Sequence, residues 1–171
     1  MPKKHSVLSA SGAHRWLACP GSIRMSEGMP KTSSTYADEG TVAHRVAGDC
    51  LRSGMNAVKY LGGMIPLNGV EYEITQDMVD AVQLYLDTVR NDWQPSNNHE
   101  LKVEHKFKLD WLYPGMFGTN DAMVCEPFGV LRVYDFKYGA GVPVEVENNP
   151  QMMYYALGAA KGDAYESVEL V

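Results

Sequence analysis

The sequence predicts a mixed α/β fold in which helices flank a central β-sheet. Within residues 35–53 and 75–93 the apolar residues recur at helical spacing, and from residue 101 they alternate with polar residues as in a strand. A helical segment and a last apolar stretch follow. The expected order is therefore helices, a meander of three strands, a helix and a strand. With 45% hydrophobic and 21% charged residues, the 171-residue chain has the composition of one folded domain spanning residues 1–171.

Helices are predicted in three places before the sheet, at residues 9–21, 35–53 and 75–93. Ser9 or Ser11 caps the first of them, and the Pro20-Gly21 pair ends it. In the third helix the apolar residues recur along one helical face. Residues 26–34 are polar and turn-rich and form a loop, while residues 54–74 form a loop with short strand pieces.

Three strands are expected after residue 100, at residues 101–109, 117–126 and 130–137. The second and third form a hairpin through Pro127-Phe128-Gly129. A last helix begins with Asn149 as its N-cap and Pro150 at its first position, and it runs to about residue 161. The chain ends at residues 168–171 in a strand that has just begun, so we expect the sequence to be a fragment truncated at the C-terminus.

The net charge of −6 is unevenly distributed along the chain. Residues 1–60 hold 8 Lys and Arg against 4 Asp and Glu, whereas residues 61–171 hold 7 against 17. An acidic average argues against a non-specific nucleic-acid binder. It is compatible with an enzyme whose carboxylates gather around a cation and whose basic N-terminal part faces a polyanion.

The sequence points to a cytoplasmic protein with no membrane partner. No run approaches the roughly 18 to 20 apolar residues of a membrane helix, and no apolar signal-peptide core follows the N-terminus. The three cysteines are widely spaced and form no CxxC pair, which indicates a reducing compartment rather than a disulfide framework.

The predicted hairpin brings two carboxylates together. If Glu126 pairs with Val130, counting back along both strands places Asp121 opposite Asp135. Two ionised carboxylates about 5 Å apart repel by roughly 3 kcal/mol at an effective dielectric of about 20. A cation must compensate such a pair, so Lys137, on the same face as Asp135, and a divalent metal are the expected partners. If the register is shifted by one residue, Asp135 and Lys137 are instead a surface ion pair that contributes little stability.

Five short motifs follow one another along the chain: SASGAHRWLACPGS at 9–22, GTVAH at 40–44, GTND at 118–121, DFK at 135–137 and QMMYY at 151–155. Together and in this order they resemble the motifs of the PD-(D/E)xK nuclease superfamily, specifically its RecB-like exonuclease branch. The best match is an uncharacterised phage-encoded group within that branch. The resemblance runs from residue 9 to about residue 155, and it implies a restriction-endonuclease-like core in which the sheet carries the active site.

The resemblance implies a binding site for Mg²⁺ or Mn²⁺. His44, Asp121 and Asp135 would hold the ion together with the backbone carbonyl of Phe136, and the imidazole would shift the preference towards Mn²⁺. The ion would polarise the scissile phosphate and lower the pKa of the attacking water. Lys137 would orient or activate that water and offset phosphate charge.

The resemblance also implies a role for the last helix in catalysis and DNA binding. Gln151 and Tyr155 would hold the DNA backbone or position Lys137. Glu104, on the polar face of the first strand, is expected to form a structural ion pair with a neighbouring Lys, with approach to the active site as the alternative. Charge alone suggests phosphate contacts in the basic N-terminal part, from Arg15, Arg24 and Lys31.

Some RecB-like relatives hold an iron–sulfur cluster, with one cysteine in the N-terminal signature and three near the C-terminus. Cys19 stands at the first of these positions, but residues 126–171 contain no cysteine. We therefore expect no iron–sulfur cluster in this chain.

The leading hypothesis is a metal-dependent DNA nuclease, an exonuclease more than an endonuclease, that acts with phage replication or recombination proteins in the host cytoplasm. The alternative is a catalytically silent nucleic-acid-binding or assembly module with a nuclease fold. The presence of Asp121, Asp135 and Lys137 argues against that alternative, since a decayed site should have lost at least one of them. A third hypothesis is an unrelated metal-dependent hydrolase of a small phosphate ester. The sequence assigns no oligomeric state.

Overall fold

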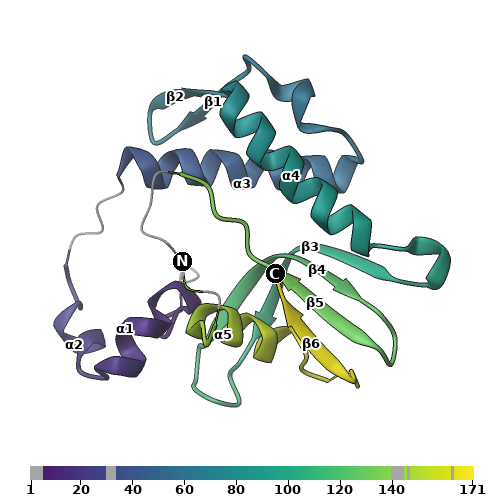
Figure 1. Cartoon of the computed structure of the whole chain (residues 1–171). Coiled ribbons are helices and arrows are strands. Elements are labelled where there is room, and N and C mark those ends of the chain that lie inside the picture. The colour runs from purple at the N-terminus through teal and green to yellow at the C-terminus, as the bar shows by residue number, and fades with distance from the viewer. Residues whose placement is uncertain (1–5, 30–33, 140–144, 146, 163) are drawn as a thin grey trace.

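The computed structural model describes residues 6–29, 34–139, 145, 147–162 and 164–171. A four-stranded sheet in the order β3-β4-β5-β6 has helices on both faces (Figure 1). The first three strands form an antiparallel meander, and β6 lies parallel to β5. The strands are β3 (Glu100–Lys108), β4 (Phe117–Cys125), β5 (Val130–Tyr134) and β6 (Ser167–Leu170). The predicted mixed α/β fold with flanking helices is confirmed.

Two long helices cover one face of the sheet and shorter ones the other. α3 (Thr35–Ser53) and α4 (Gln76–Asp92) bury their apolar stripes against the sheet in the largest hydrophobic core. α5 (Pro150–Ala159) covers the opposite face, and α1 (Ala13–Ala18) packs beside it. The remaining elements are η1 (Ala10–Gly12), α2 (Ser22–Met25), η2 (Ala57–Tyr60), β1 (Met64–Leu67), β2 (Val70–Glu73) and η3 (Pro95–Asn97).

Side-chain caps fix the starts of the three main helices, because the first amides of a helix have no partner inside it. Ser34 caps α3 and Thr75 caps α4, each accepting a hydrogen bond from the amide three residues further on. Asn149 caps α5 through the amides of Gln151 and Met152, with Pro150 at the first position. The predicted start of the last helix is confirmed.

The predicted helix at 9–21 is wrong in part. The segment divides into η1 and α1, and α2 follows after a turn. Neither Ser9 nor Ser11 caps a helix start with its side chain. Instead, the backbone carbonyl of Ser9 accepts a hydrogen bond from the Trp16 indole at 2.9 Å. The expected short strand pieces within 54–74 are confirmed as the antiparallel β1–β2 hairpin, and the expected loop at 26–34 lies partly outside the described residues.

The hairpin between β4 and β5 has the register that the sequence predicts. The ladder pairs Ala122 with Tyr134 and continues to Cys125 with Leu131, and Glu126 then bonds Val130. One step in the other direction, this register sets Asp121 opposite Asp135.

The predicted strand 130–137 is too long, however, because β5 ends at Tyr134. Asp135 and Lys137 belong to the irregular segment that leaves the sheet. The amide of Asp135 still bonds the carbonyl of Val171, which keeps Asp135 beside β6 (3.1 Å).

The side chains of β3 change from one face of the sheet to the other near the middle of the strand. Leu101 and Val103 pack into the core under α3 and α4, whereas Phe107 packs against Tyr154 of α5 on the other face. Between them Glu104 has φ +50°, and it is missing from the ladder that pairs its two neighbours with β4. A positive φ costs a non-glycine residue about 1–2 kcal/mol. The strand therefore accepts local strain where its side chains change sides.

α5 is held close to the sheet by Phe107 and two glycines. The Phe107 ring lies against Gly118 of β4 and Gly158 of α5, and a Cβ at either glycine would overlap the ring. This contact fixes the distance between α5 and the sheet, so it also positions Gln151 and Tyr155, which α5 carries.

Within the described part of the chain, no helix is both long and apolar enough to cross a membrane. The three cysteines are all among the described residues and none forms a disulfide, with Cys50 and Cys125 buried and Cys19 exposed.

We predict that Gly158→Ala lowers the free energy of unfolding by about 1–3 kcal/mol, because its methyl group overpacks the Phe107 ring. The same change at an uncrowded helical position would stabilise the protein by about 1 kcal/mol. Urea denaturation followed by circular dichroism measures the difference. Phe107→Leu serves as the matched background, in which the cost of Gly158→Ala should shrink. Unchanged or increased stability of Gly158→Ala would contradict the packing argument.

Candidate active site

Asp121 joins three elements of the fold. Its Oδ1 lies 3.2 Å from Nδ1 of His44, which projects from the middle of α3. Its Oδ2 accepts a hydrogen bond of 2.8 Å from the backbone amide of Phe136, just beyond β5. Asp135 directly follows Tyr134, and the ladder partner of Tyr134, Ala122, directly follows Asp121, so the hairpin register brings Asp135 next to Asp121. The structure thus brings together residues from three of the sequence motifs.

Lys137 and Gln151 both contact Asp135. The Lys137 ammonium lies 2.5 Å from one carboxylate oxygen of Asp135, and the Gln151 amide donates to the other at 3.4 Å. The same Gln151 amide also donates to the Tyr155 hydroxyl at 3.1 Å, one turn further along α5. Because Asp135 is 6% exposed and Lys137 is 45% exposed, the lysine stands between a buried carboxylate and solvent.

Two motif glycines allow the elements of the site to approach one another. A Cβ at Gly40, the first residue of the GTVAH motif, would lie 3.3 Å from the backbone carbonyl of Tyr138. The chain that leaves Lys137 can therefore cross close over α3. Gly118, the first residue of the GTND motif, is the residue of β4 that contacts Phe107.

Burial and neighbouring charges raise the pKa of three groups at the site. Burial raises the pKa of Asp135, although the ammonium of Lys137 opposes it. Burial alone would lower the pKa of His44, but the hydrogen bond and the charge of Asp121 outweigh it and raise that pKa. Burial also raises the pKa of Tyr155 to about 12, so its phenol stays protonated at neutral pH.

The donor set has the chemistry that Mg²⁺ or Mn²⁺ requires, namely two carboxylates and one imidazole. Each of these three side chains already has a partner in the structure. His44 contacts Asp121, and Asp135 is paired with the Lys137 ammonium. No three His, Cys, Asp or Glu side chains of the described residues are arranged around a common point that could hold a metal ion. A cation would therefore take over contacts that His44 and Lys137 make in the structure. The donor types suit such an ion, although the described side chains are not gathered around one point.

Phe136 contributes its amide and its ring to the site. Its ring lies 5.4 Å from the His44 ring and 4.8 Å from the Tyr85 ring, measured between centroids. The expected ligand role of its backbone carbonyl stays a prediction.

Tyr85 and Arg52 were missed by the sequence analysis. Tyr85 lies on the apolar stripe of α4, where a tyrosine reads as core, yet its ring contacts Phe136 beside the carboxylates. Glu104 was expected to pair with a neighbouring Lys, and this expectation is wrong: its partner is Arg52 of α3, at 2.8 Å. The positive φ of Glu104 turns its side chain towards that helix.

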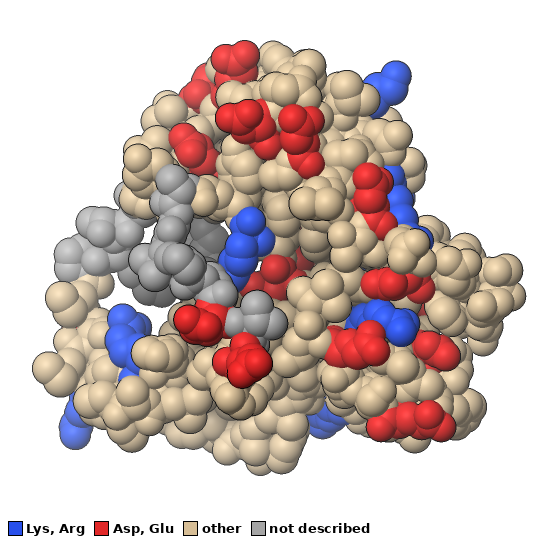
Figure 2. Space-filling model, in the orientation of Figure 1, with Lys and Arg blue, Asp and Glu red and all other residues tan. Residues whose placement is uncertain are grey.

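The expected phosphate contacts lie apart from the carboxylates. Arg15 on α1 and Arg24 on α2 are exposed, and Lys31 falls outside the described residues. Figure 2 shows acidic side chains gathered over the β1–β2 hairpin and the helices beside it, while the basic side chains of the described residues are scattered singly over this face.

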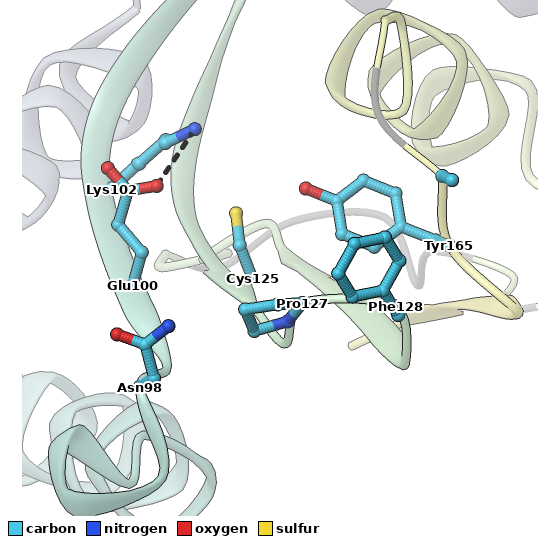
Figure 3. Close-up of a pocket in the computed structure, with 8 residues that line it drawn as sticks. Asn98, Glu100, Lys102, Cys125, Pro127, Phe128 and Tyr165 are labelled. Atoms are coloured by element: carbon cyan, nitrogen blue, oxygen red, sulfur yellow. Dashed lines mark ion pairs between the residues drawn. The ribbon is translucent and has the colours of Figure 1, made fainter.

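A pocket among the described residues lies at the hairpin end of the sheet, and none of the predicted site residues lines it. It has a volume of about 490 Å³. Phe128 and Tyr165 line one side, and the ion pair between Glu100 and Lys102 (3.2 Å) lines the other (Figure 3). The opposed carboxylates, not this pocket, are therefore the candidate active site.

We predict that the pKa of His44 in the metal-free protein lies above its ordinary value of 6.5 and falls below that value in Asp121→Asn. The substitution removes the charge that raises the pKa and leaves burial, which lowers it. The new amide oxygen can still accept the hydrogen bond from Phe136, so the fold is preserved. A proton–nitrogen NMR titration in EDTA reports both values, and equal pKa values in the two proteins would contradict the assignment.

Comparison with known proteins places the chain in a family. No solved structure matches the chain. A family model described as "Protein of unknown function (DUF2800)" matches residues 5–169. The match includes every residue that converges on Asp121 and Asp135. On that basis the chain belongs to the DUF2800 family.

Proposed function

We propose that this DUF2800 protein is a divalent-metal-dependent deoxyribonuclease that hydrolyses phosphodiester bonds, acting as an exonuclease. The observation that supports it is the convergence of His44, Asp121, Asp135 and Lys137, which come from motifs far apart in the sequence. Opposed carboxylates beside a lysine are suited to hold a cation against a phosphodiester. The proposal also includes a phage setting, a location in the host cytoplasm, and partners in replication or recombination. These parts rest only on the resemblance of the sequence motifs to RecB-like exonucleases.

Each residue of the site has a role in this reaction. When bound, Mg²⁺ or Mn²⁺ supplies the Lewis acid that polarises the scissile phosphate. Asp121 and Asp135 hold the ion, with His44 as the third side chain. Lys137, half-exposed beside Asp135, orients the attacking water and offsets phosphate charge. Gln151 holds the Asp135 carboxylate in position.

The DNA backbone lies along the side of the site that α5 and the N-terminal helices form. Tyr155 keeps its proton and can donate a hydrogen bond to a phosphate oxygen. Arg15 lies on α1, which packs beside α5, and its exposed guanidinium can contact a phosphate further along the strand. Arg24 and Lys31 are proposed as further phosphate contacts by charge alone.

We predict that Asp135→Asn abolishes DNA cleavage and leaves the fold intact, because it removes a charged metal ligand at constant volume. The assay uses end-labelled linear and closed circular DNA, single- and double-stranded, with Mn²⁺ or with EDTA. Asp110→Asn is the matched control: Asp110 lies in the exposed loop after β3 and accepts the amide of Gly115, which an asparagine can still do.

Each outcome of this assay has a separate meaning. Loss of linear DNA alone, absent in EDTA and in Asp135→Asn, supports the exonuclease. Cutting of circular DNA keeps the active site and changes the mode to endonuclease. Binding of DNA without any cutting would contradict the enzyme and favour the silent module. Hydrolysis of a generic phosphodiester in preference to DNA would favour a small-molecule hydrolase.

We predict that Lys137→Ala lowers the cleavage rate by about 10²–10⁴-fold, the usual contribution of a positioned proton-transfer group. Metal affinity should be retained, since the substitution leaves both carboxylates in place. Cleavage kinetics and calorimetric titration with MnCl₂ measure the two effects, with Lys161→Ala, in the exposed turn that follows α5, as the matched control. Wild-type cleavage by Lys137→Ala would refute the role of Lys137.

A further inference from the structure

A small pocket lies behind the carboxylate pair, between α3, α4 and the sheet. Its volume is about 10 Å³, which gives room for a water molecule. Its polar lining comes from His44, Glu104 and Asp121, and the Tyr85 and Phe136 side chains complete the wall. The pocket therefore adjoins the proposed cation site at His44 and Asp121, and neither Lys137 nor Gln151 lines it.

The Tyr85 hydroxyl has no partner in the described structure. Its oxygen is buried and makes no hydrogen bond to any described residue, and the whole residue is 9% exposed. A buried hydroxyl without a partner is destabilising, so native proteins normally supply one, often a water molecule. Burial first, and then the charges of Asp121 and Asp135, raise the pKa of Tyr85, which keeps the hydroxyl a donor.

Glu104 presents a carboxylate oxygen at the same pocket. Arg52 holds its Oε2 at 2.8 Å, while its Oε1 lies against Gly48 of α3, 3.3 Å from where a Cβ would stand. The left-handed backbone at Glu104 is what directs the side chain here. In the ladder, Glu104 falls between the pairs that flank Asp121, so the two carboxylates are neighbours across β3 and β4.

We propose that Tyr85 and Glu104 hold a water molecule in this pocket that belongs to the hydration shell of the bound Mg²⁺. The Tyr85 hydroxyl and the Glu104 carboxylate are then positioning groups that act on the cation through its water and do not touch the ion itself. This inference rests on the proposed function, because it needs the cation at Asp121 and Asp135.

The chemistry of Mg²⁺ explains why such groups matter. Mg²⁺ gives up its water ligands reluctantly, so a protein site holds it partly through hydrogen bonds to those waters. Outer partners of this kind typically change metal affinity by about 10–100-fold when they are removed. Water in the pocket also satisfies the Tyr85 hydroxyl, which packing alone leaves without a partner.

Tyr85→Phe tests the inference, since it removes the hydroxyl and keeps the ring. We expect Mg²⁺ affinity to fall about tenfold, and Mn²⁺ affinity to fall less, in calorimetric titrations of the EDTA-treated protein with MgCl₂ and MnCl₂. Without metal, the melting temperature should be unchanged or higher, because an unpartnered buried hydroxyl is lost. Glu104→Gln, which keeps an acceptor for Arg52, should weaken Mg²⁺ to a similar extent.

Tyr134→Phe is the matched control, because its buried hydroxyl is satisfied by Asp92 at 2.6 Å. It should lower the melting temperature and leave Mg²⁺ affinity unchanged, which is the opposite pattern to Tyr85→Phe. If Tyr85→Phe and Glu104→Gln both bind Mg²⁺ as the wild type does, the inference is overturned and the nuclease proposal stands. If the wild type binds no divalent metal, both fail. Metal binding that depends on Tyr85, without DNA cleavage, would keep the inference and refute the nuclease.

Discussion

The fold around the candidate site depends on the carboxylate of Asp121. One of its oxygens meets His44 of α3, and the other accepts the Phe136 amide beyond β5. A half-buried carboxylate requires such partners, because it has lost part of its hydration. The helix layer, the middle strand and the segment that carries Asp135 and Lys137 are thereby joined at one side chain. Gly40 serves the same junction, since it lets that segment cross close to α3.

The closeness of Asp121 and Asp135 also explains why basic side chains and a strained backbone residue lie beside them. Asp135 is buried, and the Lys137 ammonium offsets its charge at the solvent side. On the other side of Asp121, Glu104 is paired with Arg52 and holds a left-handed backbone conformation inside a strand. Strained residues of this kind persist where the surrounding structure over-determines them, and they cluster at functional sites. The strain here is adjacent to the carboxylates, which links the distortion of β3 to the chemistry of the site.

Helices on both faces of the sheet contribute side chains to the site. The α3–α4 face supplies His44 and the buried Tyr85, from a continuous apolar core. The α5 face supplies Gln151, which reaches Asp135 because α5 is held at a fixed height by the Phe107 ring between Gly118 and Gly158. The buried Phe107 ring thus sets the position of the hydrogen bond between Gln151 and Asp135.

The sequence by itself determined the fold class, the Asn149 cap of α5 and the register of the β4–β5 hairpin. These features depend on local signals: hydrophobic period, a capping residue before a helix, and a three-residue hairpin loop whose length fixes the pairing. The tertiary structure alone decided that Glu104 pairs with Arg52 and that Tyr85 lines a small pocket together with Glu104 and Asp121. Both follow from the packing of α3 and α4 on a strand that changes sides at one left-handed residue, and no local pattern encodes a contact between elements so far apart in the chain.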